Sequence, residues 1–222
     1  MADVFIESLV VGSWQTNCYL VGATNSSEVV VIDPGMQAAE PVRAVLKDRG
    51  WRLSGVIATH GHVDHIADAA TLANAAGVPL WLHSGDDYML TNPLAGISAE
   101  SQAVVAAMYP RGLEAPAQRR DLAGLDVVDV AGLSLAVSAA PGHTPGCVLL
   151  GAESVVWCGD VVFAGSVGRT DLPGGDPQTM RDTLRDVVLR LDDSTRLLPG
   201  HGPATSMYQE RRTNPYLQPG SL

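Results

Sequence analysis

The segment Thr59–His65, with the sequence Thr-His-Gly-His-Val-Asp-His, constrains the fold more than any other part of the chain. It contains three of the six histidines and an aspartate. Imidazole nitrogens and carboxylate oxygens are ordinary zinc ligands, and a metal site needs several of them to converge. In an extended loop His60 and His62 point to the same side, whereas Asp64 and His65 open a helix and face differently. The spacing therefore predicts ligands for two adjacent metal ions rather than one.

The sequence around this segment is typical of a strand-to-helix turn. Residues 55–58, Gly-Val-Ile-Ala, predict a short buried strand. After Asp64, apolar residues recur at helical spacing until Gly77, where a glycine commonly ends a helix, and Pro79 follows. The cluster would then lie at the carboxyl end of a strand, where α/β proteins usually bind ligands. A solvated loop with chance histidines is the alternative, and this context disfavours it.

Composition excludes several classes of protein. The 222 residues, 46% of them hydrophobic, can form one sizeable core, and nothing in them demands two domains. The net charge of −10 argues against a nucleic-acid or anionic-membrane partner. Asp3 stands where a signal peptide has basic residues, and no apolar run approaches membrane-spanning length, so we expect a cytoplasmic protein. Cys18, Cys147 and Cys158 are expected to be reduced and packed as small hydrophobic side chains.

The apolar patterns predict strands and helices in two similar halves. Strands are expected at 4–11, 18–22, 28–32, 55–58, 79–83, 125–130, 133–139, 147–150 and 154–158, with a final strand at 196–198. Helices are expected at 40–49, 64–76 and 99–108, and from Pro177, capped by Asp176, through Leu191. Residues 92–120 contain several prolines and are either a substrate loop or a connection.

Three further polar residues stand at the ends of predicted strands. His143, Asp160 and His201 each follow an apolar strand and are flanked by glycine, which lets the backbone turn tightly. With the first cluster they use five of the six histidines. We expect the sixth, His83, to be a structural hydrogen bonder. Asp33, in an Asp-Pro-Gly turn, either caps that turn or orients a metal-bound imidazole.

These motifs, in this order, resemble the signature of the metallo-β-lactamase superfamily. They are Val31–Gly35, Thr59–His65, Pro141–Thr144, Gly159–Asp160 and Pro199–Gly202, and the resemblance covers nearly the whole chain from about Asn17. Within the superfamily, Gly168-Arg169-Thr170-Asp171 together with Asp160 resembles the glyoxalase II-like hydrolases, which are relatives of hydroxyacylglutathione hydrolase. Related persulfide dioxygenases share this stretch.

The resemblance implies an α/β fold, namely an αββα four-layer sandwich with two mixed sheets and a metal centre at one edge. It implies two Zn²⁺ ions per chain, with iron or manganese as alternatives. The ligands carried over are His60, His62 and His143 for the first metal, Asp64, His65 and His201 for the second, and Asp160 as the bridge between them.

The chain departs from glyoxalase II after its last histidine. Glyoxalase II continues into a helical region whose basic residues bind glutathione, whereas here only residues 202–222 follow, with Arg211 and Arg212 as their cations. We therefore expect residues 1–222 to form a single domain of the metallo-β-lactamase type, without that C-terminal helical substrate domain. Zinc β-lactamases often have cysteine at the bridging position or lack one of the ligands, which disfavours a lactamase.

The function implied is a zinc-dependent hydrolase that cleaves thioesters of the S-2-hydroxyacyl-thiol type. A hydroxide bound to the metals, which Asp64 and Asp160 help to hold, would attack the carbonyl carbon, because zinc lowers the pKa of bound water to about 7. A thiolate then leaves without a strong general acid, since a free thiol has a pKa of about 8.5. The expected partner is a small-molecule thioester, with no nucleic acid and no membrane.

Two other functions and one residue role stay open at this point. A mononuclear iron persulfide dioxygenase would use His60, His143 and Asp160 as a two-histidine, one-carboxylate triad. A metal-binding module without catalysis would not need Asp160. Arg169 either docks an anionic substrate or holds its own loop through a buried ion pair with Asp171.

Overall fold

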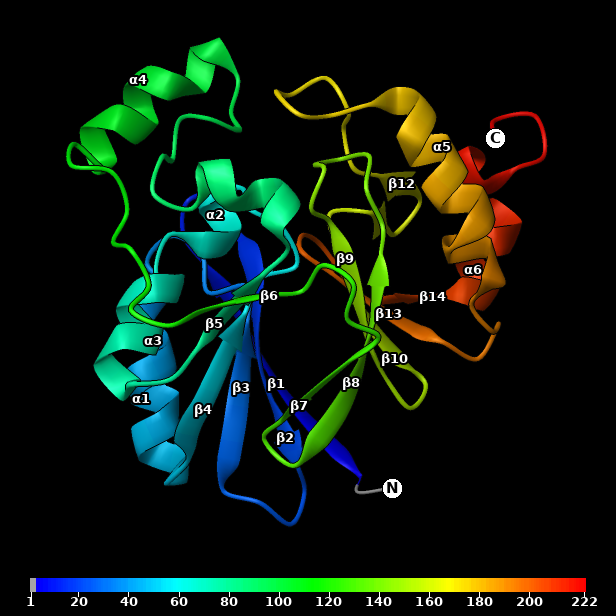
Figure 1. Ribbon diagram of the computed structural model, residues 1–222. Coiled ribbons are helices and arrows are strands. Elements are labelled where there is room, and N and C mark those ends of the chain that lie inside the picture. Colours follow the sequence, from blue (N-terminus) through cyan, green and yellow to red (C-terminus); the bar gives the residue numbers. More distant parts are fainter. Residues whose placement is uncertain (1–2) are drawn as a thin grey trace.

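Two six-stranded sheets face each other, and helices cover both outer faces (Figure 1). This computed structural model describes residues 3–222. The strand orders are β1-β2-β3-β4-β5-β6 and β14-β13-β10-β9-β8-β7. Both sheets are mixed, because β3 to β6 pair in parallel in the first and β10 pairs in parallel with β13 in the second. The αββα four-layer α/β sandwich expected from the sequence is confirmed.

The first sheet and its helices come from the N-terminal half. The strands are β1 (Val4–Val11), β2 (Thr16–Ala23), β3 (Glu28–Ile32), β4 (Arg52–Ile57), β5 (Leu80–Leu82) and β6 (Arg119–Asp121). The helices are α1 (Ala39–Arg49), α2 (Val63–Ile66), α3 (Ala69–Ala76), the 3-10 helix η1 (Ser84–Met89) and α4 (Ala99–Met108).

The second sheet follows in the C-terminal half. Its strands, with a short separate hairpin, are β7 (Val127–Val130), β8 (Leu133–Ala139), β9 (Val148–Ala152), β10 (Val155–Gly159), β11 (Val162–Phe163), β12 (Ser166–Val167), β13 (Arg196–Pro199) and β14 (Thr205–Ser206). The helices are α5 (Pro177–Asp186), η2 (Val188–Arg190), α6 (Met207–Thr213) and η3 (Pro215–Leu217). None of the helices in residues 3–222 combines the length and hydrophobicity that crossing a bilayer requires.

The core has one layer between the sheets and one under the helices on each side. Ile32, Leu135 and Trp157 pack between the sheets and are completely buried. Val42 of α1 and Leu72 of α3 cover the outer face of the first sheet, while α5 covers the second. Burying a side chain of this size contributes about 1.5–3 kcal/mol. The central strands are buried on both faces, which explains their nearly continuous apolar sequences.

Most expected strands differ from the observed ones by one to three residues at an end, and three expectations differ further. The helix expected at 64–76 is divided at Asp68 into α2 and α3, because the Asp68 side chain accepts a hydrogen bond from the Ala39 amide at 2.7 Å. The helix from Pro177 ends at Asp186 rather than Leu191, and η2 follows. The strand at 196–198 is not the final one, since β14 pairs antiparallel with it.

The sandwich brings the polar motifs to one edge. Strands β3 and β4 run parallel, so the residues after Ile32 and Ile57 emerge side by side. Strands β10 and β13 do the same in the second sheet, and the loop between β8 and β9 reaches the same edge. Loops at the carboxyl ends of parallel strands commonly hold ligand-binding residues, and here two sheets supply them together.

Candidate metal centre

Seven side chains from both sheets converge at this edge in three overlapping groups. In each group the candidate ligand atoms lie within 4.8 Å of one another. The groups are His60, His62 and His143; His60, His65 and Asp160; and Asp64, His65 and His201. All seven ligands expected from the sequence are therefore brought together, and all but the partly exposed His201 are buried.

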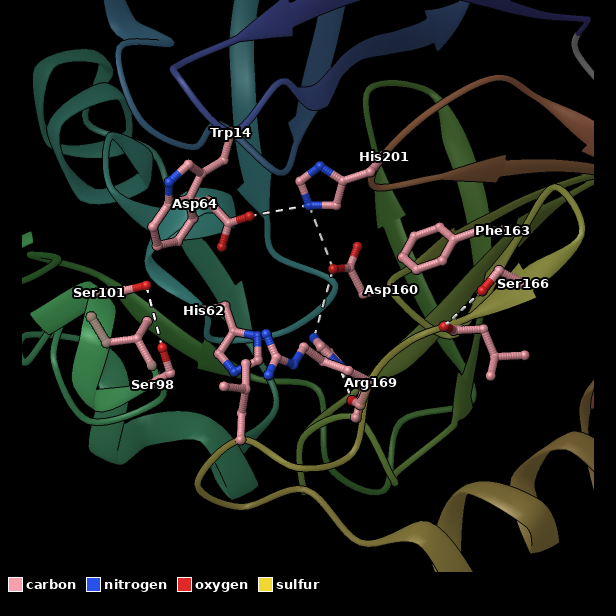
Figure 2. A pocket seen from close by; sticks show the side chains of 14 residues that line it. Trp14, His62, Asp64, Ser98, Ser101, Asp160, Phe163, Ser166, Arg169 and His201 are labelled. Carbon is pink, nitrogen blue, oxygen red and sulfur yellow. Dashed lines mark hydrogen bonds and ion pairs between the residues drawn. The ribbon is translucent and has the colours of Figure 1, made fainter.

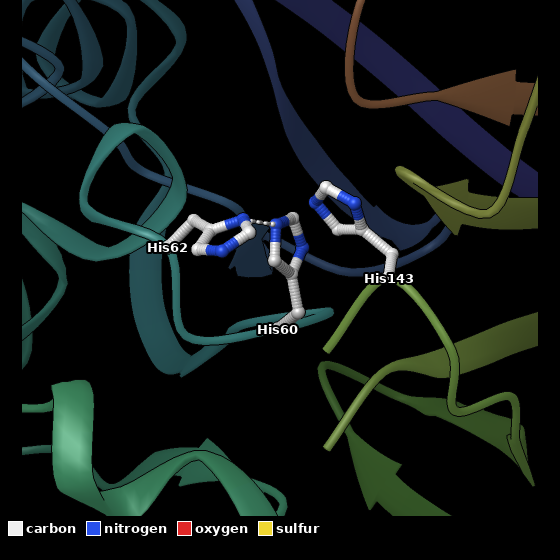
Figure 3. Close-up of side chains that lie close together, drawn as sticks. All are labelled: His60, His62 and His143. Carbon is white, nitrogen blue, oxygen red and sulfur yellow. Dashed lines mark hydrogen bonds between the residues drawn. The ribbon is translucent and has the colours of Figure 1, made fainter. Parts of the chain in front are cut away.

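The first group combines two loops. His60 and His62 lie on the turn after β4, and His143 lies on the loop between β8 and β9 (Figure 3). His60 Nε2 and His62 Nδ1 face each other at 3.1 Å. The ring of His143 lies edge-on to both, with centroids 4.9 and 4.6 Å away.

The group of Asp64, His65 and His201, called the second group from here on, lies beside the first. His65 Nε2 and His201 Nε2 are 3.3 Å apart, and Asp64 Oδ2 lies 3.1 Å from His201 Nε2. Asp160 lies between the groups, with Oδ1 3.4 Å from His65 Nε2 and Oδ2 3.6 Å from His143 Nε2. Figure 2 shows Asp160 beside His201 and Asp64. A carboxylate in this place can contact a cation on either side.

The loop that carries His201 is fixed to the opposite sheet. The backbone N–H of Asn17 in β2 donates to the Gly200 carbonyl at 2.7 Å. The Asn17 side chain donates to the carbonyls of Pro199 and Gly202 at 3.0 and 2.9 Å. One residue of the first sheet therefore sets the position of a histidine that follows a strand of the second.

The donor set fits bound cations. Two pairs of ring nitrogens face each other, His60 with His62 and His65 with His201, and a facing pair can share only one proton. A cation beside such a pair, within bonding distance of both nitrogens, would accept both lone pairs. The buried Nε2 of His143 has no hydrogen-bond partner within residues 3–222. These features match the requirements of a site with imidazole and carboxylate ligands.

Electrostatics divide the histidines into two kinds. Burial and the neighbouring imidazoles hold the pKa of His60 well below its usual value, and the same causes lower the pKa of His62 to about 3. Burial would also lower the pKa of His65, but Asp160, Asp64 and Asp33 raise it well above the usual value. His60 and His62 are therefore neutral imidazoles, the form that binds metals, whereas carboxylates surround His65.

Outer hydrogen bonds orient the rings. His143 Nδ1 lies 2.7 Å from the Arg169 carbonyl, which can only accept, so the proton is on Nδ1 and Nε2 is free for a ligand. His65 Nδ1 donates to Asp33 Oδ2 at 3.0 Å. The hydroxyl of Thr59 donates to the same Asp33 oxygen at 2.7 Å and lies 3.2 Å from His60 Nδ1. Asp33 therefore orients His65 directly and His60 through the Thr59 hydroxyl, in addition to its place in the turn.

A cavity of about 510 Å³ opens over the cluster. The walls carry aromatic and aliphatic side chains, and Figure 2 shows Trp14 and Phe163 on two sides of the floor formed by His62, Asp64, Asp160 and His201. The lining residues outside the ligand set are Trp14, Ile97, Ser98, Ser101, Phe163, Ser166, Val167, Arg169 and Leu172. Part of the 92–120 segment, at the start of α4, thus borders the cavity.

The cavity is poor in positive charge. Among the side chains of residues 3–222 that line it, Arg169 is the one arginine or lysine, and both of its hydrogen bonds to Asp171, at 2.6 and 2.7 Å, are already made. The ion pair with Asp171, one of the two roles left open for Arg169, is therefore present, but it is exposed rather than buried, with side chains 57% and 68% accessible. Arg211 binds Asp193 and two carbonyls of the 189–191 segment, away from the cavity.

Two residues, His83 and Asp86, lie near the centre but belong to none of its ligand groups. His83 Nδ1 accepts from the Gly85 amide at 3.1 Å and belongs to none of the ligand groups, which confirms its structural role. Asp86, directly after Gly85, was not foreseen, although it accepts hydrogen bonds from both loops of the first group. Its Ser-Gly-Asp-Asp context indicates only a turn.

Fold and centre together define a protein of the metallo-hydrolase type. The family model of the metallo-beta-lactamase superfamily matches residues 11–201, and this chain belongs to that superfamily. The hydroxyacylglutathione hydrolase GloC of Haemophilus influenzae is 31% identical, and the alignment covers 96% of this chain and 97% of that protein.

Solved structures with the same fold include proteins of different description. The BLEG-1 B3 metallo-beta-lactamase has a TM-score of 0.84 and 29% identity, with 96% of this chain and 100% of that chain covered. TTHA1623, in a di-iron-bound form, has a TM-score of 0.77 and 34% identity, with 95% and 100% covered. This chain is therefore similar along its length to proteins described as a hydrolase, as a lactamase and as a di-iron protein.

Proposed function

We propose that this chain is a zinc-dependent hydrolase that cleaves thioesters of the S-2-hydroxyacyl-thiol type at a centre of two metal ions. The observation that carries the proposal is the position of Asp160 between two ligand groups at the floor of an apolar cavity. A single-ion site would leave one group without a function. The similarity to GloC, described as a hydroxyacylglutathione hydrolase, supports the acyl class.

In this proposal His60, His62 and His143 hold one ion, Asp64, His65 and His201 hold the other, and Asp160 contacts both. When bound, two divalent ions would polarise the thioester carbonyl and lower the pKa of bound water to about 7. The two carboxylates offset the charge of the cations in a buried site. Iron is the alternative metal, since TTHA1623 has been solved in a di-iron-bound form.

The cavity walls orient the substrate. Trp14, Ile97, Phe163, Val167 and Leu172 offer apolar surface against which the acyl group and the carrier chain can pack. Excluding water from the polar floor strengthens each electrostatic contact there. Because a thiol has a pKa of about 8.5, the leaving group departs as a thiolate, and the site needs no strong acid.

The charge of the cavity predicts low selectivity for the thiol carrier. Glutathione carries two carboxylates, whereas the one lining cation, Arg169, is already paired with Asp171. Each dedicated polar contact would contribute perhaps 1–3 kcal/mol of discrimination, and the described residues offer no free cation for it. S-lactoylglutathione should therefore be hydrolysed with a high KM, and lactoyl thioesters of uncharged thiols should compete well.

The test is kcat/KM for the metal-loaded enzyme across lactoyl thioesters of glutathione and of several smaller thiols. A chromogenic β-lactam and an acyl-homoserine lactone serve as controls, because each offers a ring carbonyl to a nucleophile and a structure with this fold is described as a B3 metallo-beta-lactamase. We expect every thioester to exceed both controls. A control substrate that exceeds all thioesters by about tenfold, equivalent to about 1.4 kcal/mol in the barrier, would exclude the thioesterase.

A further inference from the structure

The carboxylate of Asp86 joins the two loops that carry the first ligand group. Asp86 lies on η1, outside the metal cluster, and is completely buried. Its Oδ2 accepts from the Gly61 amide and from the Thr144 hydroxyl, each at 2.7 Å. Its Oδ1 accepts from the Gly146 amide at 2.8 Å. One side chain therefore satisfies three donors from two loops.

Both loops have a glycine where Asp86 approaches. A Cβ added to Gly61 would lie 2.8 Å from the Asp86 Cβ, and one added to Gly146 would lie 2.6 Å from its Cγ. Real Cβ atoms do not come this close to other heavy atoms. The sequence therefore omits two side chains so that this carboxylate can enter between the loops.

These contacts adjoin the ligands. Gly61 separates His60 from His62, and Thr144 follows His143 directly. Apart from Asp86, the Val148 amide joins the loops by donating to the Thr59 carbonyl at 2.9 Å. The three imidazoles of the first group come from both loops, so their ring nitrogens keep a common centre only if the distance between the loops is fixed.

We propose that Asp86 is a positioning residue that fixes the distance between the His60–His62 loop and the His143 loop, and thereby sets the metal affinity of the first group without touching the metal. This inference rests on the two-metal centre proposed above and is independent of the substrate. It also explains why position 86 requires an acid rather than an amide. Both oxygens must accept, so an asparagine in either orientation places its NH₂ against a backbone N–H.

The experiment compares zinc binding to metal-free wild type, Asp86→Asn and the control Glu210→Gln in competition with a chromophoric chelator. Glu210 is a matched control, because it is also completely buried and accepts three hydrogen bonds. Its donors are the Gly165 amide, the Thr205 hydroxyl and the Asn214 amide, at 2.8, 2.6 and 2.9 Å, which hold the β11–β12 turn instead of the first group.

We expect Asp86→Asn to weaken one of the two zinc sites by about 10–100-fold while the other site and Glu210→Gln stay close to wild type. Hydrogen exchange should accelerate at the amides of Gly61 and Gly146 in the same variant. Thr144→Val removes a single hydroxyl from the contact and should weaken the same site by a smaller factor. This milder variant carries the test if Asp86→Asn does not fold.

Unchanged affinities in Asp86→Asn, or in Thr144→Val where the first variant is not obtained folded, would overturn the role of Asp86. Equal losses in Asp86→Asn and Glu210→Gln would also overturn it, because they would report general destabilisation. A wild-type protein that binds fewer than two zinc ions would instead overturn the two-metal centre, and the role of Asp86 with it. The failure of the inference and the failure of the centre are thus distinguishable.

Discussion

The imidazole of His65 donates from Nδ1 to Oδ2 of Asp33 over 3.0 Å, and neither side chain is more than 1% exposed. Asp33 has a backbone φ of 53°, an uncommon value for a residue with a side chain. Its other oxygen accepts from the Thr59 amide at 2.7 Å. A turn residue in a strained conformation therefore holds one histidine directly and the start of the histidine loop as well.

This contact predicts the effect of Asp33→Asn. The amide can no longer accept from all three donors, so the ring of His65 loses its fixed orientation and metal affinity should fall by about 10–100-fold. Chelator competition measures the change. Asp129→Asn is the surface control, because the exposed Asp129 side chain accepts a hydrogen bond from the Ser134 hydroxyl in the β7–β8 hairpin, away from the centre. Equal affinities in wild type and Asp33→Asn would contradict the assigned role.

Metal removal should lower the melting temperature. The proposed ligands extend from His60 to His201 and join both sheets, so cations that bind only the folded chain stabilise it. At about a thousandfold excess of metal over Kd the stabilisation is about 4 kcal/mol, which corresponds to a shift on the order of ten degrees. Calorimetry before and after chelation measures it, with elemental analysis to verify removal. A constant melting temperature would show that the ligands do not bind metal together.

Asp160→Ala should cost far more activity than His83→Ala. Asp160 lies between both ligand groups, so its loss disturbs two ions, whereas His83 contacts the Gly85 amide and no group of the centre. We expect a loss of about a hundredfold or more in kcat for the first variant and a change within about threefold for the second. Steady-state kinetics with a lactoyl thioester measures kcat for both variants. A larger loss in His83→Ala than in Asp160→Ala would refute the ligand assignment.

Arg169→Gln tests whether this side chain docks the substrate. Because Arg169 is exposed and already paired with Asp171, the substitution should reduce kcat/KM by less than about threefold for charged and uncharged thiol carriers alike. The carbonyl that orients His143 belongs to the backbone and is kept. A selective loss of about tenfold or more for S-lactoylglutathione would instead assign Arg169 to the carboxylates of the substrate.

The three cysteines should be inert in the folded protein. Cys18, Cys147 and Cys158 are buried and unpaired, and burial raises the pKa of each thiol well above its usual value. The thiolate is the reactive form, so a chromogenic disulfide reagent at about pH 8 should react slowly with the native protein and with all three thiols in denaturant. A rapid reaction of one native equivalent would indicate an accessible cysteine.

The seven residues that converge at the sheet edge were predictable because each belongs to a local pattern. Every one follows an apolar strand, and strand ends are visible within a few residues of sequence. The Ala131-Gly132 turn was equally visible, and both residues have a positive φ, 55° and 73°, as this short hairpin requires. Helix ends at Gly50 and Gly77 were predicted from the same kind of local signal, and both glycines have the left-handed backbone conformation of a helix C-cap.

Other features depend on distant contacts and were not predictable. Strand β6, with the charged sequence Arg-Arg-Asp, exists because its backbone pairs with β5, from Leu80 with Arg119 onward. The partners of Asp86 lie 25, 58 and 60 residues away in the sequence. The break at Asp68 depends on the Ala39 amide, which a helical pattern does not show. Where a polar side chain serves a remote backbone, only the folded chain identifies its role.

The metal content of protein purified without added metal tests the two-metal centre most directly. Elemental analysis of the whole transition series, normalised to protein concentration by amino-acid analysis, gives both the identity and the number of ions. The seven side chains at the sheet edge predict close to two ions per chain, mainly zinc. A single iron per chain, with oxygen consumption on persulfide substrates, would contradict the account and assign the cluster to a mononuclear dioxygenase.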